Sequence, residues 1–277
     1  MARRVRVSIE MCSCTTFVSG SHRWSVALSR LICLLLSGMW STLAVGELPL
    51  RVAVASNFVG TAAVIAELYT ERTGTEVDLI VSSTGKLYAQ IVRGAPFDVF
   101  LSADQRRPEM LYQKGKLENS EVYAKGLLAF WSKQRSREEE CSERAMLRAS
   151  SRVAIANPEI APYGEAAKHV LSEAESPAVG SEKITRSESV GQAYSLVAVD
   201  AVQVGLVSYA QVKHHEHSAE HCVVLVSSNR YPPIRQAGGV VVNSHNVIRA
   251  REFMKLLISN EGLALILSAG YGAPQDG

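Results

Sequence analysis

Short apolar runs alternate with longer amphipathic stretches along most of the chain. The runs are rich in Val, Ala, Ile and Leu, as expected for strands buried on both faces. They occupy residues 50–55, 76–81, 98–101, 152–156 and 204–207. Helical patterns, several of them ended by glycine, occupy residues 58–71, 87–93, 105–115, 164–173, 190–199, 246–258 and 261–267. This alternation predicts an α/β fold with mostly parallel sheets flanked by helices.

One extended segment departs from the alternation and indicates a second lobe. Residues 126–131 have the pattern of a strand, and the charged run at 136–140 that follows them is typical of a solvated surface helix or loop. We predict a first lobe of residues 47–126 and 227–277 and a second lobe of residues 127–226. Ligands of open α/β sheets bind beyond the carboxyl ends of strands, so we expect the site in the cleft between the lobes.

The first 46 residues have a different character from the rest. Arg23 and Arg30 precede an apolar run at 31–36, and small residues follow at 44–46. This order is typical of an export signal, which predicts cleavage near Gly46 and a periplasmic location. The apolar run is shorter than the roughly 20 residues that span a membrane. An uncleaved anchor is the alternative.

Composition and charge narrow the classes of partner. Hydrophobic residues make up 47% of the chain and charged residues 20%, as in soluble globular proteins. The 29 basic and 27 acidic residues leave a net charge of +2 without a basic stripe, which argues against a nucleic-acid partner. Outside the predicted signal only Cys141 and Cys222 remain. They can pair in an oxidising compartment, but their spacing leaves the pairing open.

Two short polar segments each follow a predicted strand and open a predicted helix. Ser56 and Asn57 follow the strand at 50–55, and Ser82-Ser83-Thr84-Gly85-Lys86 follows the strand at 76–81. Hydroxyls and free backbone N–H groups at helix N-termini bind anions. Such residues also cap helices without binding a ligand. Two segments on neighbouring strands, one with three consecutive hydroxyls, favour an anion site.

Later segments offer further donors. Tyr163 follows Pro162 near a helix start, where its phenol can reach a ligand or pack on the surface. Val190 lies near another helix N-terminus, where its backbone N–H can donate, although an apolar residue beside a cap is common. We expect Lys86 to face solvent, because a cation at a helix start opposes the helix dipole.

The candidate donors include no Asp or Glu, and this favours one class of anion. A fully deprotonated oxyanion offers only acceptors, whereas phosphate keeps a proton near neutral pH and needs an acceptor in its site. A tetrahedral dianion such as molybdate, tungstate or sulfate therefore fits best.

Enzyme motifs are scarce in the sequence. The segment from His214 to His221 could hold a divalent metal, but it lacks zinc-like spacing, and we interpret it as a solvated loop. There is no G-x-S-x-G or H-E-x-x-H, and Ile80 stands where a P-loop needs its first glycine. We predict no catalytic residue, resident metal or cofactor. An exported metal-dependent enzyme and a sensory domain are the alternatives.

The chain resembles the periplasmic molybdate-binding proteins of ABC importers. The resemblance spans about residues 48–274 and rests on VASNF at 54–58, SSTGKLYAQI at 82–91, GAPFDVFLSAD at 94–104, ANPEIAPYG at 156–164, SVGQA at 189–193 and YG at 271–272. It implies two α/β lobes that close on one oxyanion. The implied ligand-binding residues are Ser56, Asn57, Ser83 or Thr84, Tyr163 and the backbone of Val190.

The resemblance also implies a biological role. A monomer would capture molybdate or tungstate and deliver it to a membrane permease without catalysis, with sulfate or another oxyanion as the alternative ligand. Some family members use a tyrosine after the strand that matches residues 204–207. Here Ser208 takes that place and Tyr209 follows it.

Overall fold

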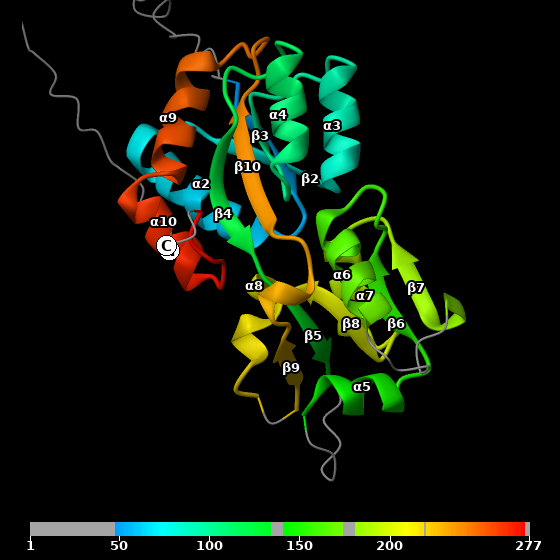
Figure 1. Ribbon diagram of the computed structural model, residues 1–277. Coiled ribbons are helices and arrows are strands. Elements are labelled where there is room, and N and C mark those ends of the chain that lie inside the picture. The colour runs from blue at the N-terminus through cyan, green and yellow to red at the C-terminus, as the bar shows by residue number, and fades with distance from the viewer. Residues whose placement is uncertain (1–47, 134–140, 174–180, 219, 275–277) are drawn as a thin grey trace, which may run out of the picture. The chain divides into compact units, whose positions relative to one another are not determined.

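The computed structural model describes residues 48–133, 141–173, 181–218 and 220–274, and its strands form two sheets (Figure 1). In spatial order, the first sheet contains β2 (Val77–Ser82), β1 (Leu50–Ala55), β3 (Val99–Leu101), β10 (Ile234–Val240) and β4 (Glu121–Gly126). The second contains β7 (Ile184–Ser187), β6 (Val153–Ala156), β8 (Val204–Ser208), β5 (Leu128–Ser132) and β9 (Cys222–Leu225).

Both sheets are mixed and share one design. Three strands pair in parallel, β2-β1-β3 in the first sheet and β7-β6-β8 in the second, and the other two strands join antiparallel. The parallel strands include all five apolar runs of the sequence. The chain passes between the sheets after β4 and again before β10. The predicted α/β class is therefore confirmed, with antiparallel strands added to each sheet.

Helices cover the sheets. The first sheet carries α2 (Val59–Thr73), α3 (Thr84–Val92), α4 (Arg106–Gln113), α9 (Val247–Leu257) and α10 (Asn260–Ser268). The second carries α5 (Glu143–Ala149), α6 (Pro162–Glu173), α7 (Val190–Ala198) and α8 (Tyr209–Val212). Single 3₁₀ turns are η1 (Ser181–Lys183), η2 (Lys213–His215) and η3 (Ser228–Arg230).

The first sheet has apolar clusters on both faces, because successive side chains of a strand point to opposite sides. On β1, Val52 and Val54 join a cluster with α2, α9 and α10, whereas Ala53 joins one with α3 and α4. Figure 1 shows α2, α9 and α10 on one side of this sheet and α3 and α4 on the other. Burial on both faces explains why the apolar runs are nearly continuous.

The sequence pattern missed several elements, chiefly β4, β7, β10 and α5. In β10, Gly238 and Gly239 hide the strand signal. A Cβ on Gly238 would lie 2.6 Å from the carbonyl oxygen of Phe100, and one on Gly239 would lie 2.2 Å from that of Asn119. Glycine is required there because neighbouring backbone approaches so closely.

The predicted strand at 126–131 divides between the two sheets. Gly126 ends β4 in the first sheet, and β5 begins at Leu128 in the second. The charged run at 136–140 lies outside the described residues.

Cys141 and Cys222 form a disulfide, with their Cα atoms 5.5 Å apart. The bond ties the segment just before α5 to the start of β9. The pairing that the sequence left open is thus formed.

We expect loss of this disulfide to lower the free energy of unfolding by about 2–4 kcal/mol, because the bond restricts the unfolded chain. Its cysteines are 81 positions apart. Urea unfolding with and without reductant measures the effect. The double variant Cys141→Ala/Cys222→Ala should be as unstable as the reduced protein and insensitive to reductant. Equal midpoints for oxidised and reduced protein would contradict the expectation.

Candidate functional site

The two polar segments lie side by side at the carboxyl ends of β1 and β2. Ala55 pairs with Ser82 in the parallel register, and the backbone N–H of Ser56 donates to the carbonyl of Ser82 over 3.0 Å. All four candidate residues that follow these strands are buried: Ser56, Asn57, Ser83 and Thr84. The pairing of two neighbouring strands thus brings two separate sequence motifs into one place.

Ser83 carries a hydroxyl without a partner. The residue precedes α3 and is only 3% exposed, and its Oγ has no hydrogen-bond partner among the residues that the structure describes. Leaving a buried polar group unpaired costs about 1–3 kcal/mol. Thr84 beside it accepts a hydrogen bond from the backbone N–H of Ala103 (3.0 Å), and its own hydroxyl proton is left to donate. The pair points to a ligand that offers acceptors.

The N-terminus of α7 meets Ser56. The N–H of Gly191 donates to Ser56 Oγ over 3.1 Å, and the N–H of Gln192 donates to Ser189 Oγ over 3.2 Å. The first N–H groups of a helix have no partner within the helix, so that of Val190 is left for another acceptor. A Cβ on Gly191 would lie 2.9 Å from Ser56 Cβ, so glycine permits this approach.

Tyr163 enters the site from the first turn of α6, which begins at Pro162, two residues before the predicted start. Its buried phenol oxygen accepts hydrogen bonds from Ser208 Oγ (3.0 Å) and Gln236 Nε2 (3.2 Å). Burial raises the pKa of Tyr163 well above its ordinary value, so the phenol stays neutral and keeps its proton. Tyr163 is therefore a neutral donor.

Asn57 is held by residues that the sequence did not single out. Its side-chain Nδ2 donates to Gln236 Oε1 over 2.9 Å, and its backbone carbonyl oxygen accepts from the hydroxyl of Tyr271 over 2.6 Å. Gln236 escaped notice because its strand was not predicted. Tyr271 lies in the Tyr-Gly motif near the C-terminus, but nothing in the sequence indicates which residue it contacts.

Ser208, which takes the place of a family tyrosine, is fully buried against Tyr163. The hydroxyl of Tyr209 instead donates to Glu216 Oε2 over 2.7 Å. The structure thus places Ser208 among the polar side chains around the candidate site and directs the Tyr209 hydroxyl toward an exposed carboxylate.

Further contacts join the segments that follow the two sheets. The N–H of Gly85 donates to the carbonyl of Ile160 over 3.0 Å, and Lys86 Nζ lies 2.6 Å from Glu188 Oε2. Lys86 faces solvent, as predicted, with its side chain 44% exposed. Exposed pairs of this kind contribute little stability.

A cavity of about 730 Å³, lined by α2, α8, η2 and α10, reaches Asn57 from one side.

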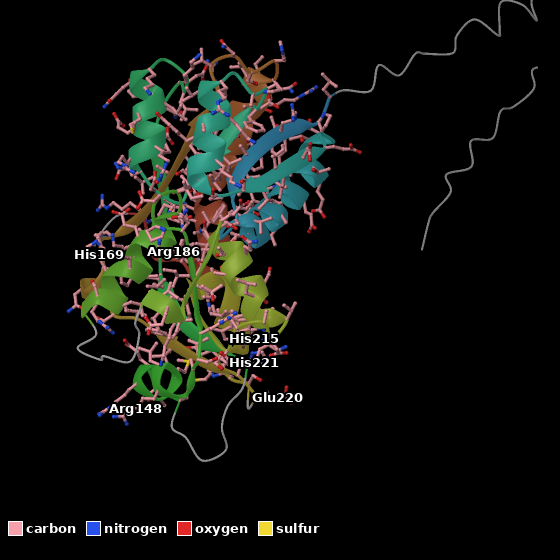
Figure 2. The ribbon with its side chains drawn as sticks, turned by 90° about the vertical axis from the view of Figure 1, so that its right-hand side faces the viewer. Arg148, His169, Arg186, His215, Glu220 and His221 are labelled. Carbon is pink, nitrogen blue, oxygen red and sulfur yellow. A yellow bond between two sulfur atoms is a disulfide. The ribbon has the colours of Figure 1, made fainter. Side chains whose placement is uncertain are left out.

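The histidine-rich segment is only partly a solvated loop. His214 and His217 are exposed, but His215 and His221 stack on one another with ring centroids 4.0 Å apart (Figure 2). His221 Nδ1 accepts from the indole N–H of buried Trp131 over 3.1 Å. The prediction of a solvated loop is wrong for these two rings, because the indole needs cover and an acceptor.

The alternative of a metal site gains no support from the part of the chain that the structure describes. Within it, no three His, Cys, Asp or Glu side chains gather closely enough to hold a metal ion. Among the same residues, no helix is both long and apolar enough to cross a membrane.

Comparison with known proteins identifies the family. The pattern described as "Bacterial extracellular solute-binding protein" matches residues 50–272. The chain belongs to this family. It is 35% identical over 222 residues to the molybdate-binding protein ModA of Rhodobacter capsulatus, covering 79% of this chain and 86% of that protein. It is 31% identical over 250 residues to the ModA of Azotobacter vinelandii, covering 90% and 99%.

A solved structure agrees with these relatives. The periplasmic molybdate-binding protein of Azotobacter vinelandii superposes with a TM-score of 0.76 at 33% identity, covering 82% of this chain and all of that one. The resemblance drawn from the sequence motifs and the expected binding-protein fold are therefore confirmed for this solute-binding protein.

We expect stability to fall as the pH drops, in part through His215. Burial, followed by the neighbouring His214 and His221, lowers the pKa of His215. The unfolded chain then binds more protons, so this contribution to stability is lost below a pH of about 6.5. The ring of His215 stacks on that of Trp131 with centroids 5.6 Å apart, so His215→Phe keeps an aromatic ring there but cannot titrate. Thermal unfolding between about pH 7 and pH 5 should show a weaker pH dependence for this variant.

Exposed His217 supplies the control for that measurement. His217→Gln should keep the pH dependence of the parent protein. An unchanged pH dependence in His215→Phe would contradict the role assigned to His215.

Proposed function

We propose that this protein captures molybdate or tungstate in the periplasm and delivers it to the permease of an ABC importer, without catalysing a reaction. The observation that carries the proposal is the set of buried neutral donors beside the Ser83 hydroxyl, which has no partner in the described part of the chain. The names of the two relatives described above and of the superposed structure point to the same ligand.

The groups that we propose to contact the anion are hydrogen-bond donors. Hydroxyls come from Ser56, Ser83, Thr84 and Tyr163, and backbone N–H groups come from Asn57 and Val190. The N-termini of α3 and α7 add partial positive charge. Neutral, preoriented donors stabilise a dianion without the cost of burying a counter-ion.

Capture and release require the two lobes to move. We assign residues 47–126 and 227–277 to one lobe and 127–226 to the other, with the hinge at the two crossings between the sheets. Contacts such as Gly191 to Ser56 and Gly85 to Ile160 would form on closure around the anion. Opening would break them and expose the anion to the permease.

Export completes the proposal. The features of residues 1–46 fit a signal that is removed on the way to the periplasm. The protein would then act there as a monomer, with no resident cofactor.

Titration calorimetry of residues 47–277 tests the ligand class. We expect one-to-one binding of molybdate and tungstate, with weaker binding of sulfate and of phosphate at neutral pH. Sulfate and the larger oxyanions offer the same acceptors, so the size of the enclosed space must separate them. If only sulfate binds, the proposed ligand is wrong and the proposed site stands. Failure to bind any of these anions would overturn the proposal.

Ser83→Ala should weaken molybdate binding by about 1–3 kcal/mol, because one buried donor is lost. Since Ser83 Oγ has no partner among the described residues, the ligand-free variant should unfold at the same temperature as the parent or higher. Calorimetry and thermal unfolding measure the two effects.

The exposed residue Ser151 offers a matched control for that substitution. Ser151→Ala should change neither quantity. Unaltered affinity in Ser83→Ala would remove this residue from the site.

A further inference from the structure

Gln236 connects candidate ligand-binding residues from both sheets. It lies on β10 and is fully buried. Its Oε1 accepts from Asn57 Nδ2 over 2.9 Å, and its Nε2 donates to the phenol oxygen of Tyr163 over 3.2 Å. Asn57 follows a strand of the first sheet, whereas Tyr163 begins a helix that packs on the second. One uncharged side chain thus holds two parts of the site together.

The hydrogen bond from Gln236 determines whether the Tyr163 phenol donates or accepts toward a ligand. A phenol oxygen has one proton to donate and accepts through its lone pairs. Gln236 Nε2 and Ser208 Oγ both donate to it, so the phenol proton must point elsewhere. The amide nitrogen cannot accept that proton. Tyr163 is therefore left as a donor for a bound anion.

The backbone around Gln236 is built to leave room for this bond. A Cβ on Gly126 would lie 2.4 Å from the phenol oxygen of Tyr163 and 2.9 Å from Gln236 Nε2. Gly126 ends β4, where the chain leaves the first sheet. A side chain at this crossing would displace the pair of hydrogen-bonded groups.

The other end of the amide orients Asn57. Gln236 Oε1 accepts a hydrogen bond from Asn57 Nδ2, and the hydroxyl of Tyr271 donates to the backbone carbonyl oxygen of Asn57. Tyr123, also fully buried, packs against the same oxygen, with its hydroxyl 3.3 Å away. The position of the Asn57 backbone N–H therefore depends on Gln236 as well.

We propose that Gln236 is a positioning residue that keeps the Tyr163 phenol a donor toward the bound anion and so favours oxyanions that carry no proton. This inference rests on the proposed function. Hydrogen phosphate carries a proton that needs an acceptor, and Tyr163 cannot accept it while Gln236 Nε2 and Ser208 Oγ both donate to its oxygen. Molybdate and tungstate need no such acceptor.

Gln236→Glu tests the proposal, because it exchanges the amide nitrogen for an oxygen at nearly constant volume. The new oxygen accepts the Tyr163 proton and draws it away from the anion. Calorimetry with molybdate should show affinity about 10-fold to 100-fold lower at pH 8. The loss should shrink as the pH is lowered and the new carboxyl becomes protonated. The affinity for hydrogen phosphate relative to molybdate should rise.

A double-mutant cycle shows whether Gln236 acts through Tyr163. Tyr163→Phe alone should weaken molybdate binding. Added to Gln236→Glu, it should lower the affinity for molybdate little further. Gln236→Met adds no charge, so it should bind molybdate more weakly without gaining a pH dependence. If Gln236→Glu does not fold, Gln236→Met takes its place in the double-mutant cycle. Gln203 is exposed, and Gln203→Glu should behave as wild type.

Each outcome has a distinct meaning. Wild-type affinity in both Gln236 variants, or independent and additive effects of Gln236→Glu and Tyr163→Phe, would overturn the role of Gln236. A wild-type protein that binds none of molybdate, tungstate or sulfate would instead overturn the proposed function.

Discussion

A buried hydrogen-bond donor must find an acceptor, and the site of this protein is organised around that constraint. Ser83 Oγ is buried without a partner among the described residues, and Tyr163 has a phenol proton that neither Gln236 Nε2 nor Ser208 Oγ accepts, since both donate to its oxygen. Burying such groups lowers stability unless a ligand satisfies them. These buried donors therefore need acceptors from a ligand, and an oxyanion without protons supplies them.

The two sheets supply the geometry that makes this possible. Parallel strands end at the same edge, so the segments after β1 and β2 lie together and their helices begin there. The second sheet brings α6 and α7 to the same place, where Gly191 meets Ser56. No charged side chain is among the proposed ligand-binding residues, so the helix ends and hydroxyls share the task of balancing the anion.

Rigid support surrounds these donors. The apolar clusters on both faces of the first sheet fix β1, and the Cys141–Cys222 disulfide fixes part of the second. Gln236, Ser208 and Tyr271 then orient the donors through hydrogen bonds within the interior. Preoriented donors lose little freedom on binding, which favours tight capture of a small ion.

The sequence alone determined the parallel strands other than β7, most helices and the family, because apolar periodicity and the motifs around Ser56, Ser83, Tyr163 and Val190 are local features. It could not reveal β10, whose glycines are explained by backbone approaching from Phe100 and Asn119. It also could not reveal that Gln236 joins Asn57 to Tyr163, residues 179 and 73 positions away. Only the tertiary structure decides such pairings, because a hydrogen bond depends on distance in space and leaves no periodic signal in the chain.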